Sequence, residues 1–144
     1  MAEKKLTEAM GEAIILARES KTAFGAVLID ANFKVLFSAA NSTRTYGKLA
    51  HAEMNLLHRA GTELGDLSHY ALVSTCEPCP MCMGAILWHG IGKVYYGASI
   101  EDASKYMPQL KISAREIAEK SGKQTEVVGG ILRDKCVALF ESIE

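Results

Sequence analysis

The chain lacks a long hydrophobic run. No stretch approaches the ~18 uninterrupted apolar residues that a transmembrane helix requires. The N-terminus, Met1 to Lys5, leads into an amphipathic segment that contains Glu8 and Glu12, and such a segment is not the core of a signal peptide. These absences favour a cytoplasmic protein that does not associate with membranes.

An excess of charge of one sign is also absent. The chain has 16 basic and 17 acidic side chains, which leaves a formal net charge of −1. Nucleic-acid partners usually select a basic stripe, so the balance argues against such a partner, although it leaves a local basic patch open.

Internal repeats, low-complexity runs and linkers are missing as well. Proline occurs only 3 times and the 12 glycines are scattered. A length of 144 residues lies within the usual range of one domain, so we expect a single domain over residues 1–144.

Hydrophobic periodicity and turn residues predict ten elements along the chain. Apolar residues at helical spacing, together with capping residues, predict helices over residues 6–20, 50–60 (ended by Gly61), 79–89, 113 to about 121, and 131–143. Short apolar runs predict strands over residues 25–29, 35–40, 70–75, 93–98 and 126–129, the first two as a hairpin. Strands that alternate with helices favour an α/β layered domain, with the hairpin antiparallel and parallel neighbours among the other strands.

Three of the four cysteines are clustered, at Cys76, Cys79 and Cys82, whereas Cys136 lies in a distant apolar segment where a core role is expected. In a reducing compartment such a cluster indicates metal ligation before it indicates disulfides. Cys79 and Cys82 form a Cys-x-x-Cys pair at a predicted helix start, where the helix dipole favours the thiolate form that binds metal. His51 adds a nitrogen donor, and two sulfurs with one nitrogen suit zinc.

Three protein ligands leave a fourth position for water, which distinguishes a catalytic zinc site from a structural one. Zinc lowers the pKa of a bound water toward ~7. Glu53 lies two residues after His51, so its carboxylate can reach that water without binding the metal and can act as a proton shuttle.

Other interpretations of this cluster remain. Cys79 and Cys82 could form a redox pair, and Cys76 could complete a closed structural site with His51. The closed site would leave Glu53 without a role. A zinc-stabilised binding module without activity is the alternative outside enzymes, and the retained Glu53 argues against it.

At these residues the sequence resembles the cytidine deaminase-like superfamily of zinc deaminases, whose signature is H-x-E followed by P-C-x-x-C. The similarity extends from about residue 22 to residue 140. It implies a three-layer α/β/α fold with a central mixed five-stranded sheet, a zinc cofactor on His51, Cys79 and Cys82, and Glu53 as the catalytic residue. It also implies a homodimer.

Within the superfamily, the branch of guanine, cytosine and tRNA adenosine deaminases is the most similar. Residues 75–86 resemble the guanine deaminase form of the zinc motif, and Trp88 matches a tryptophan of that group. The resemblance implies substrate contacts from the residues that match the family's pocket: Phe24, Gly25, Asn41, Ala52 and Trp88. Phe24 could equally be a core residue and Asn41 could cap a turn.

The resemblance therefore implies hydrolytic deamination of a small-molecule nucleobase or a related aminated heterocycle, with guanine as the first expectation. A cytosine or nucleoside deaminase is the second. A tRNA adenosine deaminase is the third, because the chain ends in an acidic segment at residues 140–144 where the tRNA enzymes usually carry a basic one.

Overall fold

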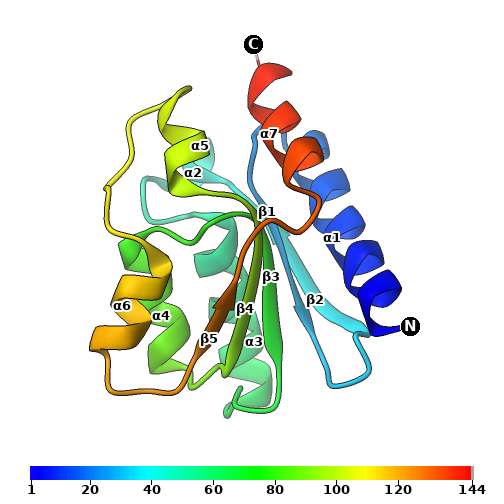
Figure 1. Ribbon diagram of the computed structural model, residues 1–144, viewed down its shortest axis with the longest axis vertical. Coiled ribbons are helices and arrows are strands. Elements are labelled where there is room, and N and C mark those ends of the chain that lie inside the picture. Colours follow the sequence, from blue (N-terminus) through cyan, green and yellow to red (C-terminus); the bar gives the residue numbers. More distant parts are fainter. Residues whose placement is uncertain (144) are drawn as a thin grey trace.

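The computed structural model describes residues 1–143 and contains seven helices and five strands in that part of the chain (Figure 1). The helices are α1 (Ala2–Glu19), α2 (Thr43–Tyr46), α3 (Ala52–Leu64), α4 (Pro80–Trp88), α5 (Ile100–Ser104), α6 (Ala114–Lys120) and α7 (Arg133–Glu141). The strands are β1 (Gly25–Ile29), β2 (Val35–Ala40), β3 (Ala71–Cys76), β4 (Lys93–Ala98) and β5 (Glu126–Val128).

The five strands form one mixed sheet in the order β2-β1-β3-β4-β5. Strand β1 pairs antiparallel with both β2 and β3, whereas β3, β4 and β5 run parallel to one another. The expected α/β class, the five-stranded mixed sheet and the antiparallel hairpin are confirmed.

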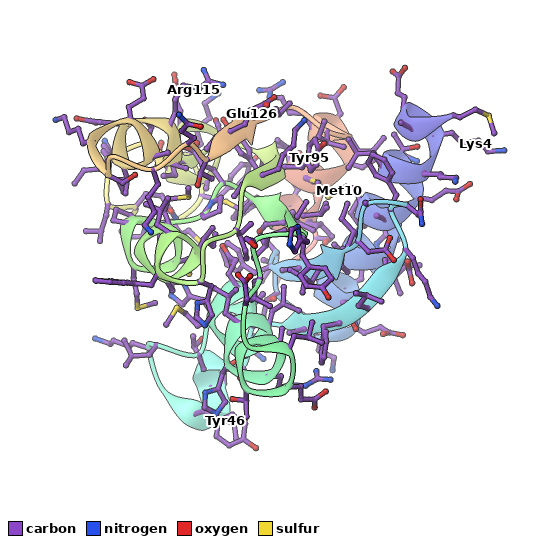
Figure 2. All side chains as sticks on the ribbon, turned by 90° about the horizontal axis from the view of Figure 1, so that it is seen from below. Lys4, Met10, Tyr46, Tyr95, Arg115 and Glu126 are labelled. Atoms are coloured by element: carbon purple, nitrogen blue, oxygen red, sulfur yellow. The ribbon has the colours of Figure 1, made fainter. Side chains whose placement is uncertain are left out.

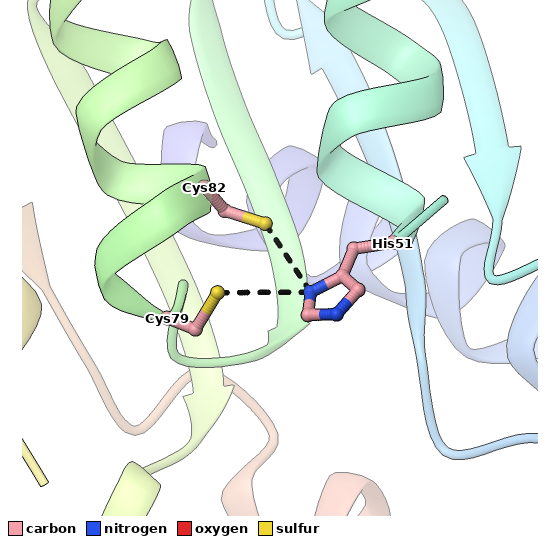
Figure 3. A group of neighbouring side chains, drawn as sticks. All are labelled: His51, Cys79 and Cys82. Atoms are coloured by element: carbon pink, nitrogen blue, oxygen red, sulfur yellow. Dashed lines mark hydrogen bonds between the residues drawn. The ribbon is translucent and has the colours of Figure 1, made fainter. Parts of the chain in front are cut away.

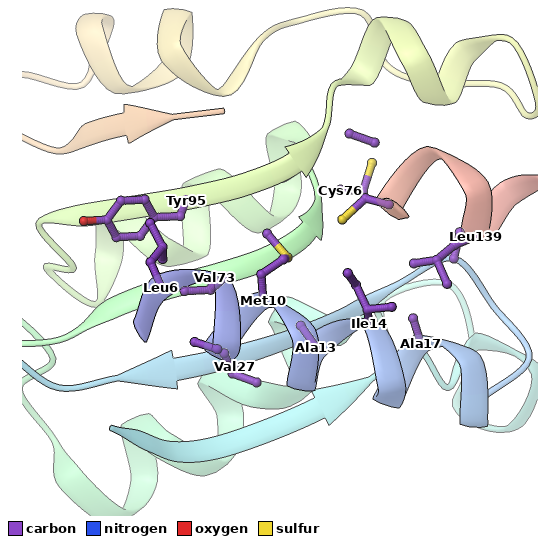
Figure 4. Packing of buried hydrophobic residues seen from close by; sticks show 14 of the residues in the cluster. Leu6, Met10, Ala13, Ile14, Ala17, Val27, Val73, Cys76, Tyr95 and Leu139 are labelled. Carbon is purple, nitrogen blue, oxygen red and sulfur yellow. The ribbon is translucent and has the colours of Figure 1, made fainter. Parts of the chain in front are cut away.

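Helices cover both faces of the sheet, which gives three layers (Figure 1). On one face, α1 and α7 pack over β1, β3 and β4, and the helical spacing of Met10, Ala13 and Ile14 places these buried side chains against Val27 and Val73 (Figure 4). On the other face, α3, α4 and α6 enclose a second apolar cluster. Because side chains alternate along a strand, β1 supplies both clusters.

The predicted end of the helix over residues 50–60 is wrong. Helix α3 passes through Gly61 and ends at Leu64, before Gly65, whose φ of 74° suits glycine. Gly61 has a packing role instead, because a Cβ there would lie 2.6 Å from Nε2 of His89 at the end of α4. The glycine therefore allows α3 and α4 to approach closely.

Two short helices were missed by the sequence analysis. Helix α5 carries a recognisable signal, a capping box in which Ser99 accepts from the backbone N–H of Asp102 and the Asp102 carboxylate accepts from the backbone N–H of Ser99. Helix α2 has only four residues and no side-chain cap. Among residues 1–143, no helix combines the length and the apolar character that a membrane crossing requires.

Candidate active site

The predicted functional residues meet at one end of the sheet. The parallel strands β3 and β4 both finish there, β2 also ends there, and the antiparallel β1 begins there. Helices α3 and α4 start at this end, with His51 and Cys79 as their N-cap residues. In open α/β sheets, ligands bind outside the carboxyl ends of parallel strands, so this edge is where a site is expected.

His51, Cys79 and Cys82 present their donor atoms to one another (Figure 3). Nδ1 of His51 lies 3.6 Å from Sγ of Cys79 and 3.5 Å from Sγ of Cys82. Tetrahedral zinc, with Zn–N and Zn–S bonds of about 2.0 and 2.3 Å, separates its nitrogen and sulfur ligands by about 3.5 Å. The three side chains therefore already have the spacing that one zinc ion requires.

The electrostatics of the pair of thiols suit a metal cation. The hydrogen bond from Cys82, followed by the one with His51, lowers the pKa of Cys79 to about 4, so this sulfur is a thiolate at neutral pH. The same contact with Cys79 raises the pKa of the Cys82 thiol, because the two sulfurs share a proton. The pKa of His51 is also raised, chiefly by its hydrogen bond with Cys79. A divalent cation would replace these protons.

Glu53 lies in the first turn of α3 and its carboxyl group faces the same site. The residue is only 5% exposed, and burial raises the pKa of its carboxyl group to about 7. A carboxyl group with a pKa near neutrality can both accept and release a proton, which is the property that the shuttle role requires.

Cys76, the candidate fourth ligand, does not join the cluster. Among residues 1–143, the group of side chains that can share a metal consists of His51, Cys79 and Cys82. Cys76 ends β3, is buried in the apolar cluster beneath α1 and α7, and burial raises its thiol pKa well above the usual range (Figure 4). Among residues 1–143 the arrangement has three protein ligands, as a catalytic site does, and no fourth protein ligand.

A cavity of about 700 Å³ opens beside these residues, a volume that accommodates a small heterocycle. Its lining joins the metal cluster to the pocket wall and consists of Phe24, Asn41, Thr43, Lys48, His51, Glu53, Cys76, Glu77, Cys79, Met107, Pro108, Gln109 and Leu110.

Phe24 and Asn41, two of the predicted substrate contacts, line this cavity. Phe24 stands edge-on against Phe140, with ring centroids 5.6 Å apart. Oδ1 of Asn41 accepts hydrogen bonds from the backbone N–H (3.0 Å) and the hydroxyl (2.9 Å) of Thr43. Asn41 therefore shapes a turn, and its Nδ2 donor has no hydrogen-bond partner within residues 1–143.

Three other predicted contacts do not line the cavity. Gly25 begins β1 so close to α1 that a Cβ would lie 2.1 Å from the carbonyl oxygen of Ala13. Ala52 is buried in the apolar cluster beneath α3 and α4. Trp88, at the end of α4, is 87% exposed and is not among the residues that line this cavity, so its predicted substrate contact stays a prediction.

The sequence analysis missed part of the pocket. Residues 107–110, which form its outer wall, and Lys48 carry no motif that identifies them as pocket residues. Glu77 was recognised only as part of the zinc motif, yet its carboxylate is buried and accepts two backbone hydrogen bonds. Asn55 on α3 donates to the Ala40 carbonyl (2.9 Å), which holds the end of β2 next to the site.

Comparison of the sequence with known protein families identifies the family to which this site belongs. Residues 2–98 match the cytidine and deoxycytidylate deaminase zinc-binding region. The chain belongs to this family. It is a zinc-dependent deaminase, a hydrolase of C–N bonds, and its His/Cys/Cys cluster is the zinc-binding set typical of the family.

Relatives with different substrates are comparably similar. A probable cytosine deaminase of Schizosaccharomyces pombe is 32% identical over 83% of this chain and 77% of its own length. The tRNA-specific adenosine deaminase of Bacillus subtilis is 34% identical over 95% and 84%, and the guanine deaminase of that organism is 37% identical over 57% and 54%. The chain also matches 24% of a longer protein, the tRNA(Ile)-lysidine synthase of Deinococcus radiodurans.

Solved structures support the same fold. A mutant of the protein NE0047 in complex with 8-azaguanine has a TM-score of 0.83 and 26% identity, over 96% of this chain and 83% of that one. The cytidine deaminase-like fold implied by the sequence is confirmed.

Proposed function

We propose that this chain hydrolyses the exocyclic amino group of a free nucleobase or related heterocycle, with guanine as the favoured substrate. The observation that carries this proposal is the cavity of about 700 Å³ that is lined by His51 and Cys79 of the metal cluster together with Glu53, Phe24 and Asn41. The similarity of the fold to a protein that binds the purine analogue 8-azaguanine supports a purine in that space.

In the proposed reaction, water replaces the amino group and ammonia leaves. His51, Cys79 and Cys82 would hold the zinc ion, which would supply the Lewis acidity that lowers the pKa of the attacking water. Glu53 takes a proton from that water, delivers it to a ring nitrogen, and then transfers the second proton to the departing amine. Phe24 offers an apolar contact to the planar ring, and Nδ2 of Asn41 donates a hydrogen bond to an acceptor on the edge of the base.

Ammonia release from a panel of substrates tests this proposal. The purified zinc-loaded protein is incubated with guanine, cytosine, adenine, their nucleosides and aminated triazines. We expect guanine to have the highest kcat/KM. A higher value for cytosine or for a nucleoside would overturn the guanine assignment, and no ammonia from any compound would count against small-molecule deamination as a whole.

A second candidate, tRNA adenosine editing, is favoured by a basic cavity next to the pocket. Arg18, Lys21 and Arg44 line a cavity of about 530 Å³, and their side chains have no hydrogen bond or ion pair within the described part of the chain. Arg44 directly follows Thr43, which lines the pocket. This cluster is the local basic patch that the net charge left open, and it could contact phosphates.

Binding of tRNA at increasing salt separates the two candidates. If tRNA is the substrate, its binding weakens steeply with salt, and Arg18→Gln and Arg44→Gln reduce the slope. If a free base is the substrate, these variants leave kcat/KM for guanine unchanged.

We also propose that the protein is a homodimer. Large apolar side chains, including Tyr46 and Trp88, are exposed in the single chain, and Tyr46 projects from its periphery (Figure 2). Because a second copy could cover such side chains, Trp88 keeps a possible role near a subunit contact. Sedimentation of the wild type and of Trp88→Ser at micromolar concentration tests this, and a monomeric wild type would contradict it.

A further inference from the structure

We propose that Glu77 is a positioning residue that holds the outer wall of the pocket against the zinc-binding loop and thereby sets substrate affinity and selectivity. The kinetic part of this inference rests on the proposed function. The structural part is independent of the substrate.

The Glu77 carboxylate uses both of its oxygens on the backbone of two different helices. Oε1 accepts a hydrogen bond from the N–H of Ile100 (2.9 Å), and Oε2 accepts one from the N–H of Ala114 (2.8 Å). These donors are the first residues of α5 and α6, where backbone N–H groups have no partner within the helix. Glu77 is 7% exposed, so neither bond is open to full competition from water.

Ile100 and Ala114 lie in the sequence before and after the segment that closes the pocket. Between them, residues 107–110 form the outer wall of the cavity. The hydrogen bonds of residues 105–112 in the described structure join partners within residues 102–112, so they do not attach this wall to the sheet. The Tyr106 ring stacks on Phe140 at 5.4 Å, which is one lateral contact. Glu77 therefore joins the two ends of this wall to each other through one side chain, in addition to the contact of Asp102 on α5 with Arg133.

The two hydrogen bonds from the Glu77 carboxylate to Ile100 and Ala114 are named the Glu77 clamp. The backbone around Glu77 connects this clamp to the metal cluster. The backbone N–H of Glu77 donates to the Ala98 carbonyl at 2.7 Å, at the ends of the parallel strands β3 and β4. Two residues later, Cys79 begins α4 as a member of the metal cluster. On its far side, Glu77 lines a second cavity of about 380 Å³ together with Ser99 and Lys111. Glu77 therefore lines both cavities, and residues 107–110 line the larger one.

Variants of Glu77 that lose one or both acceptor oxygens should weaken the clamp to different extents. Glu77→Gln keeps the size and one acceptor oxygen but places an NH₂ group against the second backbone N–H. Glu77→Ala removes both acceptors and leaves two buried donors unsatisfied. Glu101→Gln is the matched control, because it makes the same charge change on α5 and no contact through that side chain is present in the described structure.

Steady-state kinetics with guanine and a competing aminated base test the positioning role. Loss of two hydrogen bonds to a charged group predicts a rise in KM of about tenfold for Glu77→Ala and about threefold for Glu77→Gln. We expect kcat per bound zinc to stay within about threefold of the wild type. The ratio of kcat/KM for the two bases should change, and Glu101→Gln should match the wild type. A fall in kcat that parallels lost zinc, with KM and selectivity unchanged, would show only a structural role and overturn the proposal.

Hydrogen exchange on the zinc-loaded protein gives a readout that needs no substrate. We expect faster exchange in peptides covering residues 99–116 of Glu77→Gln, a larger effect in Glu77→Ala, and no change around residues 51–57. Unchanged protection over residues 99–116 in both variants would overturn the clamp. If the wild type releases no ammonia from any base, the proposed function fails. The hydrogen-exchange measurement then still tests the clamp. If Glu77→Ala does not fold, Glu77→Gln carries the test.

Discussion

The two ends of the pocket are built differently. The metal end consists of His51, Cys79 and Cys82 with Glu53, all placed by the first turns of α3 and α4 next to the sheet. The outer end consists of residues 107–110, which lie in a connection without helix or strand. Leu110 there is 65% exposed. The metal-binding side chains and Glu53 are therefore held at the starts of packed helices, whereas the outer wall of the pocket is held by a few contacts.

This difference suggests how one reaction centre can serve relatives with different substrates. A metal cluster must keep its ligands within tenths of an ångström, which requires rigid elements. A wall carried by a loop can change in shape without disturbing those ligands. Variants at the metal end should therefore affect turnover, and variants at the outer end should affect affinity and stability while zinc is retained.

The largest expected effect is on turnover at the metal end. Glu53→Gln removes the proton shuttle but keeps the size of the side chain, so kcat should fall by about 10²–10⁴-fold. Zinc content should stay at one per chain, because Glu53 is not one of the three clustered donors. Ammonia release and metal analysis of the same sample measure both quantities. Unchanged turnover would show that Glu53 does not act in the reaction. Loss of zinc would show that Glu53 is a metal ligand.

On α5, next to the outer end, substitution of Asp102 should affect the stability of the fold and not turnover. Its carboxylate accepts hydrogen bonds from Nη2 (2.7 Å) and Nε (2.9 Å) of Arg133, which ties α5 to α7. Chiefly through Arg133, the pKa of Asp102 is lowered to about 2. Because the folded pKa lies below the usual value of about 4, the ionised carboxylate stabilises the fold above pH ~4, and this contribution is lost as the pH falls toward 2.

Asp102→Asn should therefore lower the free energy of unfolding by about 1.5–3 kcal/mol at pH 7, and the difference from the wild type should shrink at pH 3. Urea unfolding at both pH values measures it. Asp134→Asn is the control, because Asp134 is exposed and its contact with Arg133 is longer, at 3.6 Å. A difference that does not depend on pH would contradict the electrostatic origin.

Substitution of Asn41, which lines the pocket, tests whether this residue recognises the base. Asn41→Ala removes the free Nδ2 donor and the acceptor for Thr43, so kcat/KM should fall by an amount equivalent to about 1–3 kcal/mol. Thr43→Val removes the side-chain half of the turn contact and keeps the Asn41 amide. If both variants lose the same kcat/KM, Asn41 only shapes the turn. A loss confined to Asn41→Ala supports contact with the base.

Sequence patterns predicted the metal end of the site better than the outer end for a physical reason. His51, Cys79 and Cys82 are recognisable because metal chemistry restricts both residue type and spacing. The core strands are recognisable because burial on both faces demands continuous apolar runs. Leu110 and its neighbours face solvent and a cavity, so no periodicity marks them. Trp88 is a different case, since the family resemblance predicts a substrate contact and the single chain leaves the side chain exposed, so that this contact stays a prediction.

The smallest effect is expected at Cys76, which borders the metal end without belonging to it. Its thiol lines the cavity but packs in the apolar cluster beneath α1 and α7, outside the group of three donors. Cys76→Ser should keep one zinc per chain and change turnover by less than about threefold. Burial of a hydroxyl in apolar surroundings should lower stability by about 1–3 kcal/mol. Metal analysis decides the point: stoichiometric loss of zinc would mean that Cys76 closes the fourth position, and a site closed in that way leaves no room for the attacking water.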